Sequence, residues 1–381
     1  MSRIGCRQEL SKLMISGGIC ILLVLTQAGL AGGSSYVTTE RSVTKIADGV
    51  YVIIHKDAVF EGGPQGNTTV IIGDRGVFVV DACFLTGSAE EDIAEIRRLT
   101  PKPVRYLLNT HFHIDHNAGN GAYMEAFPAL EIIAHSETRK LMDARNPLFA
   151  ADVASPNGRP STFILPTMKK ELESGKDDDG QPLSAEDKAR LPIRMVQEEN
   201  EIADYRRFKY QPPTLTFDHE LTLDIGNREV QVKHWGRGHT PGDVFVYLPR
   251  ERVLVTGDLL TYPVPYMRMT FPHEWVEVLR AMRRMEADII VPGHGIILKD
   301  KTHLNDVIAL LGSVIKQVHE QAPKVTKVED LHVDIEFFRK KMAGDDPVDN
   351  AFWNRIVNPG MIDGANQGVV GRAFAEEFGN L

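Results

Sequence analysis

The sequence predicts an α/β fold, because strand-like and helix-like segments alternate along most of its 381 residues. A second observation supports this class: histidine and aspartate recur directly after several predicted strands, where α/β sheets place their ligand sites. The composition is that of a folded protein, with 43% hydrophobic and 25% charged residues. The formal net charge of −9 argues against nucleic acid as a partner, because phosphate groups would be repelled.

The first 31 residues have the pattern of a cleavable signal peptide. Basic residues between Arg3 and Lys12 precede an apolar run from residue 13 to 25, and small residues follow at 28–31. The apolar run is shorter than the roughly 20 residues that a spanning helix needs, so we expect no stable membrane anchor. An uncleaved anchor is the alternative. Cleavage would remove three positive charges and one negative charge, which lowers the net charge to −11 and leaves Cys83 as the only cysteine.

The first half of the chain contains short runs of β-branched and aromatic residues that end at glycine or proline. These runs predict strands at residues 49–54, 68–72, 76–80, 104–108 and 132–133. Residues 88–99 have apolar side chains at helical spacing, and residues 122–127 form a second helical segment. A layered α/β domain follows from this alternation.

Residues 138–210 differ from the rest of the chain in charge. They contain 26 charged residues, thirteen of each sign, and six prolines. We expect a charged surface insertion here that could act as a lid, with one short helix from Ser184, a favourable N-cap, to Leu191.

The core pattern resumes at Thr214. Further strands are predicted at residues 229–233, 244–248, 252–256 and 288–291, and helices at residues 274–285 and 303–321. Residues 321–381 are expected to form a C-terminal tail whose pattern indicates no role.

A cluster of histidines follows the predicted strand 104–108. The segment His111-Phe-His-Ile-Asp-His116 holds three histidines and one aspartate within six residues. Because residues two apart in an extended segment point the same way, His111 and His113 can face one position, while Asp115 and His116 turn toward another. The spacing therefore predicts two metal positions a few ångströms apart.

Three further candidates lie just after predicted strands, each beside glycine. They are His239, Asp258 and His294. Imidazole and carboxylate ligands without a thiolate are typical of a catalytic zinc site with positions open to water. Two such ions could share Asp258 as a bridge, and binding would lower the pKa of a bridging water from 15.7 to about 7.

Together with Asp81, these motifs closely resemble the metallo-β-lactamase superfamily of hydrolases. The matching segments are 111–116, Gly238-His-Thr-Pro-Gly242, Thr256-Gly-Asp258 and Pro292-Gly-His-Gly295, in that order. The resemblance implies an αββα four-layer sandwich of two mixed sheets flanked by helices, here spanning residues 44–320. It further implies that His111, His113 and His239 hold one zinc ion, that Asp115, His116 and His294 hold a second, that Asp258 bridges them, and that Asp81 steadies the ligand loops by hydrogen bonds.

The aspartate expected to bridge the two ions indicates which branch of the superfamily the chain resembles. True metallo-β-lactamases usually carry cysteine or serine at the position of Asp258, so the chain is more similar to the type-two glyoxalases and lactonases. We therefore expect a periplasmic or secreted dinuclear zinc hydrolase, whose metal-bridging hydroxide attacks the ester, thioester, lactone or amide (β-lactam) carbonyl of a small molecule. Asp115 and Asp258 are the catalytic candidates, since either could orient the nucleophile or pass a proton.

Two alternatives stay open. One is an oxidoreductase of the persulfide-dioxygenase type with a single iron ion; the other is a catalytically silent periplasmic protein that binds metal. Iron and manganese are the alternative metals in the hydrolase itself. The remaining eight histidines, His55 among them, have no convergent partners in the sequence, and a loop at residues 60–66 is interpreted as a hairpin or a cover over the site.

Overall fold

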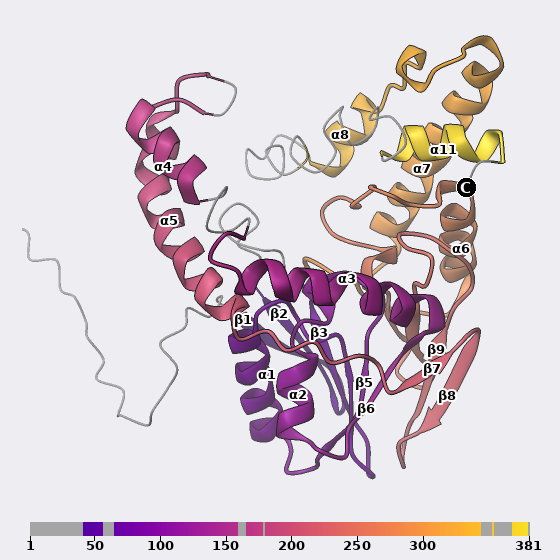
Figure 1. The fold of residues 1–381 in the computed structure, drawn as a ribbon. Coiled ribbons are helices and arrows are strands. Elements are labelled where there is room, and N and C mark those ends of the chain that lie inside the picture. Colours follow the sequence, from indigo (N-terminus) through magenta and orange to yellow (C-terminus); the bar gives the residue numbers. More distant parts are fainter. Residues whose placement is uncertain are drawn as a thin grey trace, which may run out of the picture. The chain divides into compact units, whose positions relative to one another are not determined.

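Two β-sheets pack face to face, and helices cover their outer faces (Figure 1). The computed structural model describes residues 41–55, 65–158, 165–177, 180–343, 353 and 368–379. The predicted signal peptide at 1–31 and most of the predicted loop at 60–66 lie outside these residues. The predicted four-layer αββα architecture is confirmed.

The first sheet contains seven strands in the order β1-β2-β3-β4-β5-β6-β7. Strands β1 to β4 are antiparallel neighbours, and β4 to β7 pair in parallel, so the sheet is mixed. The strands are β1 (Arg41–Ala47), β2 (Val50–His55), β3 (Thr68–Ile72), β4 (Val77–Val80), β5 (Val104–Leu108), β6 (Glu131–His135) and β7 (Leu215–Phe217). All five strands predicted for this half of the chain are present, and β1 and β7 were not predicted.

The second sheet contains five strands in the order β12-β11-β10-β9-β8. Its neighbours are antiparallel except for β11 and β12, which run in parallel. The strands are β8 (Glu220–Asp224), β9 (Glu229–Lys233), β10 (Phe245–Leu248), β11 (Val253–Val255) and β12 (Ile289–Val291). Only β8 escaped prediction, because its alternating side chains are exposed or half-buried and give no apolar run.

An apolar core fills the space between the two sheets. Phe78, Val80 and Leu108 of the first sheet belong to one buried cluster with Val232 and Val246 of the second. The helices α1 (Thr86–Leu99) and α2 (Asn120–Ala126) bury their apolar faces on the outer side of the first sheet. Central strands such as β3 and β4 are thus buried on both faces, which explains why they are continuous apolar runs.

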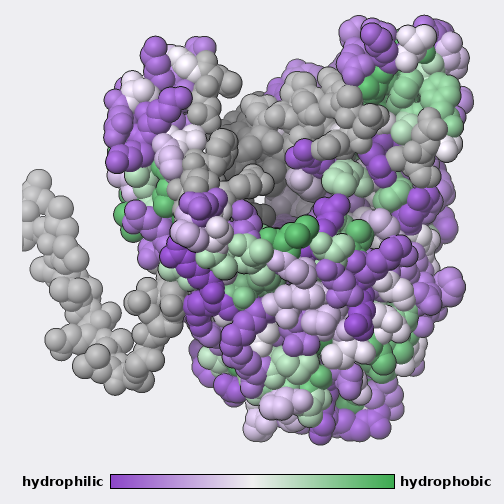
Figure 2. All heavy atoms as spheres, viewed as in Figure 1, coloured by the Kyte–Doolittle hydropathy of each residue, from purple (hydrophilic) through white to green (hydrophobic). Residues whose placement is uncertain are grey.

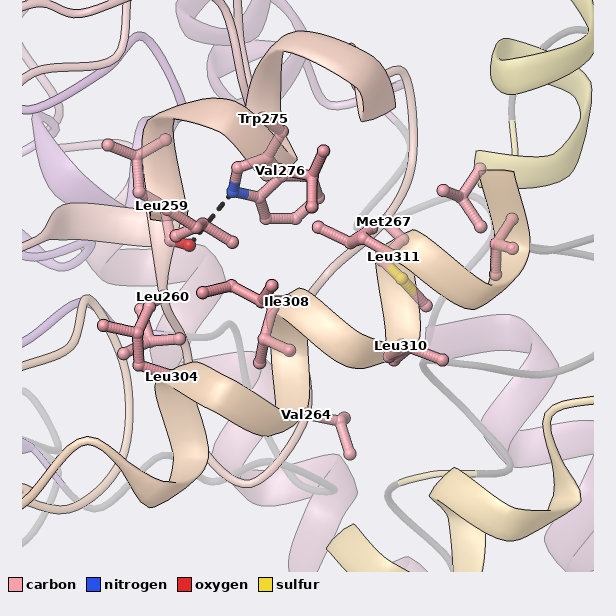
Figure 3. Close-up of a cluster of buried hydrophobic side chains, with 14 of the residues drawn as sticks. Leu259, Leu260, Val264, Met267, Trp275, Val276, Leu304, Ile308, Leu310 and Leu311 are labelled. Carbon is pink, nitrogen blue, oxygen red and sulfur yellow. Dashed lines mark hydrogen bonds between the residues drawn. The ribbon is translucent and has the colours of Figure 1, made fainter. Parts of the chain in front are cut away.

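Helices α6 (Pro272–Arg284) and α7 (Thr302–Gln321) cover the outer face of the second sheet. Trp275 is fully buried in this layer, and its indole Nε1 donates a hydrogen bond to the carbonyl oxygen of Leu259 at 3.1 Å (Figure 3). Leu259 and Leu260 follow Asp258 directly and are themselves buried in the cluster. The helical layer therefore anchors the turn that carries Asp258.

The segment predicted as a charged insertion is mostly helical. It forms α3 (Ser136–Ala154), α4 (Leu165–Ser174) and α5 (Ala185–Tyr205), and hydrophilic residues dominate the visible surface of α4 and α5 (Figure 2). The Ser184 cap is confirmed, because its side chain accepts a hydrogen bond from the backbone N–H of Asp187.

The predicted end of this helix at Leu191 is wrong. The helix continues past Pro192 to Tyr205, although an interior proline removes one backbone hydrogen bond. Leu191 and Ile202 are buried, and Ile202 packs in a small apolar cluster with Phe84 and Val153. Burial of this face offsets the lost hydrogen bond, and this tertiary contribution was not visible in the local sequence.

The C-terminal residues also join the core. The elements η4 (Ala322–Lys324), η5 (Val328–Asp330), α8 (Glu336–Met342) and α11 (Val369–Glu377) follow α7. Val369, Val370 and Ala373 of α11 are fully buried in the same cluster as Trp275. Within the described part of the chain, no helix has both the length and the apolar composition needed to cross a membrane.

A buried arginine joins the two sheets at the edge opposite the carboxyl ends of β4 and β5. Arg228 is only 5% exposed, and its guanidinium donates hydrogen bonds to the carbonyl oxygens of Asp48, Gly49 and Ile72. It also donates to Glu251 Oε1 at 2.9 Å. One side chain therefore connects two turns of the first sheet to the second sheet.

We predict that Arg228→Met lowers the free energy of unfolding by about 3–5 kcal/mol, because it removes the hydrogen-bonded partner of the largely buried Glu251 carboxylate and leaves only the more distant, exposed Arg250 at 3.6 Å. The matched control is Arg75→Met, which breaks an exposed pair with Asp224 and should cost less than about 1 kcal/mol. Urea unfolding measures both. Equal losses in the two variants would contradict the assigned role of Arg228.

Candidate metal centre

The seven side chains proposed from the sequence as ligands lie at one edge of the sandwich, on loops that follow β5, β9, β11 and β12. His111 and His113 precede the short helix η1 (Ile114–His116), which carries Asp115 and His116. Asp258 lies in η3 (Gly257–Leu259). His239 and His294 lie in the loops after β9 and β12.

Four of these side chains form a first set. His113 Nδ1 lies 3.1 Å from His111 Nε2 and 2.9 Å from His239 Nε2. Asp258 Oδ2 is 3.8 Å from His111 Nε2 and 3.6 Å from His239 Nε2. These four ligand atoms therefore surround one point.

Asp115, His116 and His294 form a second set. The Nε2 atoms of His116 and His294 are 3.1 Å apart, and Asp115 Oδ2 is 3.5 Å from the former and 3.1 Å from the latter. Asp258 belongs to this set as well, because its Oδ1 lies 3.2 Å from His116 Nε2 and its Oδ2 lies 3.6 Å from His294 Nε2. One carboxylate thus faces both sets.

The spacing of these atoms fits metal ions. Ligands about 2.0–2.1 Å from a tetrahedral zinc ion lie roughly 3.3 Å apart, close to the separations within each set. Within the described residues, Asp258 Oδ1 is buried without a hydrogen-bond partner of acceptable geometry. A buried carboxylate oxygen that faces imidazole nitrogens is suited to coordinate a cation. The donor set, imidazole and carboxylate without thiolate, is typical of catalytic zinc.

Asp81 connects the first half of the site to the sheet. Its backbone adopts φ 61°, and its Oδ1 accepts a hydrogen bond from the backbone N–H of Thr110 at 2.8 Å. Oδ2 accepts from Thr110 Oγ1 and from His116 Nδ1, both at 2.8 Å. Binding of Nδ1 fixes the His116 ring so that Nε2 points into the second set, which is the arrangement that orients histidine ligands in metal sites.

Two polar residues that the sequence analysis missed fix the ligand loops. Asn117 Nδ2 donates to the carbonyl oxygen of His113 at 2.6 Å, and Asn117 Oδ1 accepts from Asn146 Nδ2 of α3 at 2.7 Å. Asp243 accepts from both the backbone N–H and the hydroxyl of Thr240 at 2.7 Å, which closes the turn after His239. The Thr-Pro-Gly-Asp run was a recognisable turn signal for Asp243, whereas nothing local indicated Asn146.

Glycine allows the second loop to approach Asp258. A Cβ atom at Gly293 would lie 2.0 Å from Asp258 Oδ1, so any other residue before His294 would displace the carboxylate of Asp258. Tyr266 lies beside the first set: its ring centroid is 5.7 Å from that of His239, and its carbonyl oxygen accepts from His239 Nδ1. The next residue, Met267, is buried in the core.

Burial and neighbouring charges shift the pKa values of the histidines in opposite directions. Burial lowers the pKa of His113 to about 3, and it also lowers the pKa of His111 and His239, so all three are neutral and available as ligands. Burial alone would lower the pKa of His116, but the carboxylates of Asp258, Asp115 and Asp81 raise it well above its ordinary value.

The two carboxylates are held ionised. Burial would raise the pKa of Asp258, yet His116 and His294 beside it hold this pKa well below the usual range for aspartate. Asp115 behaves in the same way, with His116 as the main stabilising neighbour. Burial raises the pKa of Asp243 to about 7, against the hydrogen bonds from Thr240.

Comparisons with known proteins agree with this geometry. A family model described as "Metallo-beta-lactamase superfamily" matches residues 62–294, a range that includes all seven side chains. The chain is 26% identical over 260 residues to a linear primary-alkylsulfatase from Pseudomonas sp. (strain ATCC 19151), which covers 66% of this chain and 46% of that protein. It is 22% identical over 295 residues to an alkyl/aryl-sulfatase from Saccharomyces cerevisiae, with 73% and 41% coverage.

A solved metallo-beta-lactamase from Pontibacter korlensis has the same fold. Its TM-score is 0.50 at 18% identity, and the alignment covers 72% of this chain and 99% of that one. The two sulfatases are much longer than the segments matched, since the chain spans somewhat less than half the length of each. The comparisons therefore establish the fold and the family match, while more than half of each sulfatase lies outside the matched segment.

We predict that zinc-loaded protein loses its ions in two steps as the pH falls from 8. In the metal-free state His116 holds a proton on Nε2, because its pKa is raised and Nδ1 bonds to Asp81, so protons compete with metal at the second set. At the first set this competition begins only at lower pH, since the pKa of His113 is about 3. Zinc per chain, measured after dialysis at each pH, should fall from two to one and then to zero. Loss of both ions in a single step would contradict the difference between the sets.

Proposed function

Because this chain belongs to the metallo-β-lactamase superfamily, we propose that it is an exported hydrolase that holds two zinc ions and acts on small molecules. The observation that carries the proposal is that seven buried or half-buried side chains gather into two overlapping ligand sets. A family match alone indicates a metal-dependent hydrolase. The second, complete set around His116 is what favours two ions over one.

In this proposal His111, His113 and His239 hold the first ion, and Asp115, His116 and His294 hold the second. Asp258 is shared, since each set includes at least one of its oxygens within 3.8 Å of a histidine nitrogen. Bound there, the ions would activate water as a nucleophile near neutral pH and would polarise the bond to be cleaved.

The chain's own side chains would control protons and orientation. The low pKa values of Asp115 and Asp258 keep both carboxylates ionised, so either can accept a hydrogen bond from the attacking water and hold it in line. Asp81 fixes the ring of His116, and the carbonyl oxygen of Tyr266 fixes the ring of His239. These contacts pre-orient the ligands, which limits the reorganisation needed during the reaction.

The two alternative functions derived from the sequence predict a different metal content or a different activity from the dinuclear hydrolase. A persulfide dioxygenase with a single iron ion would not need the complete second set that this chain has, and a silent metal-binding protein would bind metal without turnover. Metal analysis and oxygen uptake distinguish the persulfide dioxygenase from a zinc hydrolase. A substrate panel distinguishes the catalytically silent protein from an active hydrolase. We retain the dinuclear hydrolase because its ligand set is complete.

A second candidate reaction comes from the relatives. We propose the carbonyl group of an ester, thioester, lactone or amide as the target, but two of the matched proteins are named as sulfatases. The same arrangement of ligands could direct water at the sulfur of a sulfate ester. A panel of β-lactams, lactones, thioesters and alkyl sulfates, run on metal-quantified protein, distinguishes carbonyl hydrolysis from sulfate-ester hydrolysis.

Export is proposed from the signal pattern at residues 1–31. The absence of any thiolate among the proposed ligands suits an oxidising compartment, because such a site would not be disrupted by thiol oxidation. Fractionation of the producing cells, together with the N-terminal sequence of the mature protein, tests this part of the proposal.

We predict that purified wild-type protein contains close to two zinc ions per chain and that Asp258→Asn contains fewer, with activity on the best panel substrate reduced at least about 100-fold. The reason is that the amide cannot offer two anionic oxygens to the two sets. Elemental analysis and steady-state kinetics measure both effects.

Asp224→Asn is the matched control, because Asp224 is exposed in β8 at the opposite edge of the sandwich and should leave metal content and activity unchanged. Thermal unfolding of the metal-free proteins checks that Asp258→Asn remains folded. Full activity in Asp258→Asn, or active wild-type protein without metal, would refute the proposed function.

A further inference from the structure

Residues 65–67 form a strap that connects the two loops of the second ligand set. The backbone N–H of Gly66 donates to the carbonyl oxygen of Asp115 at 3.1 Å, and a Cβ atom at Gly66 would lie 2.5 Å from His116 Cε1. Asn67 binds the loop that carries His294: its backbone N–H donates a hydrogen bond to the carbonyl oxygen of Gly293 at 2.7 Å. The strap therefore lies directly against the residues on both sides of the second set.

The side chain of Asn67 strengthens this connection. Its Nδ2 donates to the carbonyl oxygens of Pro292 and Gly295, both at 3.0 Å, so it spans the turn that carries His294. Asn67 is only 5% exposed, and these bonds cross more than 200 residues of sequence. These contacts of Gly66 and Asn67 all go to the loops that carry Asp115, His116 and His294.

His55, at the end of β2, holds the strap through the carbonyl oxygen of Gly66. Its Nδ1 lies 3.0 Å from the carbonyl oxygen of Gly66, and its Nε2 lies 3.0 Å from Asp92 Oδ2 in α1. Arg41 in β1 donates to the other oxygen of Asp92 at 3.0 Å. His55 is 2% exposed and Asp92 is fully buried, so this chain of contacts runs inside the protein from β1 to the strap.

The chemistry of these partners fixes what His55 does. A backbone carbonyl and a carboxylate can only accept hydrogen bonds, so both ring nitrogens donate and the ring is an imidazolium. Burial disfavours this charged form, but the Asp92 carboxylate outweighs it and raises the pKa of His55. Charge-assisted hydrogen bonds of this kind are stronger than neutral ones, so the Gly66 carbonyl is firmly placed.

His55, Cys83 and Asp92 are close enough together to suggest a third metal site. Their hydrogen bonds argue otherwise, because both nitrogens of His55 are committed and Arg41 already neutralises Asp92. The Cys83 thiol points to the carbonyl oxygen of Leu85 at 3.7 Å, and burial raises its pKa well above the ordinary value, which disfavours the thiolate that a metal needs.

We propose that His55 is a positioning residue for the second ligand set, which it acts on through its hydrogen bond to Gly66 and the strap of residues 65–67. Loss of that bond lets the strap move away from His116 and from the loop of His294, while the first set is unaffected. The inference rests on the proposed two-metal function.

The test titrates zinc alone into metal-free protein and determines the number and affinity of the sites by calorimetry. His55→Leu removes both hydrogen bonds, and we expect its second ion to bind 10- to 100-fold more weakly, in the range known for residues that orient metal ligands. The first ion should bind within threefold of wild type. His135→Asn, at a buried histidine that caps α3, is the matched control and should bind both ions as wild type does.

Two isosteric variants separate positioning from a general loss of structure. In His55→Asn the side-chain amide replaces Nδ1 and can still donate to Gly66, so the second ion should bind again with near-wild-type affinity. In His55→Gln the amide replaces Nε2 and reaches Asp92 instead, so the defect should persist. Recovery by glutamine but not by asparagine would overturn the proposal, as would equal weakening of both ions in His55→Leu.

If His55→Leu fails to fold because Asp92 is left buried and partly unpaired, Asn67→Ala provides an independent variant that leaves the Asp92 contacts intact. It should weaken the second ion selectively, and unchanged binding of both ions would refute the role of the strap. The wild-type titration separates the two levels of the argument. One zinc site in wild type refutes the two-metal function and this inference with it, whereas two sites with unaffected variants refute the inference alone.

Discussion

The buried carboxylate of Asp258 is the group on which the site depends, because it lies between two sets of histidine nitrogens and is only 5% exposed. An isolated ionised carboxylate at such a position would be strongly destabilised by the loss of solvent. The neighbouring imidazoles lower its pKa, and cations bound in both sets would complete the compensation. The surrounding structure serves to keep this carboxylate and its histidine neighbours in place.

The helix α6 and the loop after β12 both hold the segment of Asp258 in place. Trp275 in α6 donates to the carbonyl oxygen of Leu259, and Gly293 brings the β12 loop against the carboxylate without a side chain in the way. On the other side, Asp81 holds Thr110 and His116 at the end of β5. His55 contributes through its hydrogen bond to the carbonyl oxygen of Gly66. Residues from β2 to β12 therefore converge on one edge of the sandwich.

The sequence predicted most of the framework because buried strands of this fold are continuous apolar runs. The five predicted strands of the first sheet and four of the second are present, and the two helices over the second sheet begin within two residues of prediction. The errors fall where local pattern and tertiary packing disagree. The exposed edge strand β8 has no apolar run, and α5 continues through Pro192 because Leu191 and Ile202 are buried.

The sequence by itself determined the fold class, the family resemblance and the seven candidate ligands, because histidine and aspartate after apolar strands form a local, readable pattern. Their division into two sets around Asp258 was already implied by the spacing and the resemblance. Only the tertiary structure decided which buried groups hold these residues in place. Asn67 binds a turn more than 200 residues away, Asn146 reaches Asn117 from α3, and His55 meets Asp92 across the layer between β2 and α1. Such contacts depend on the packing of whole layers, so no periodicity or motif in the chain could indicate them.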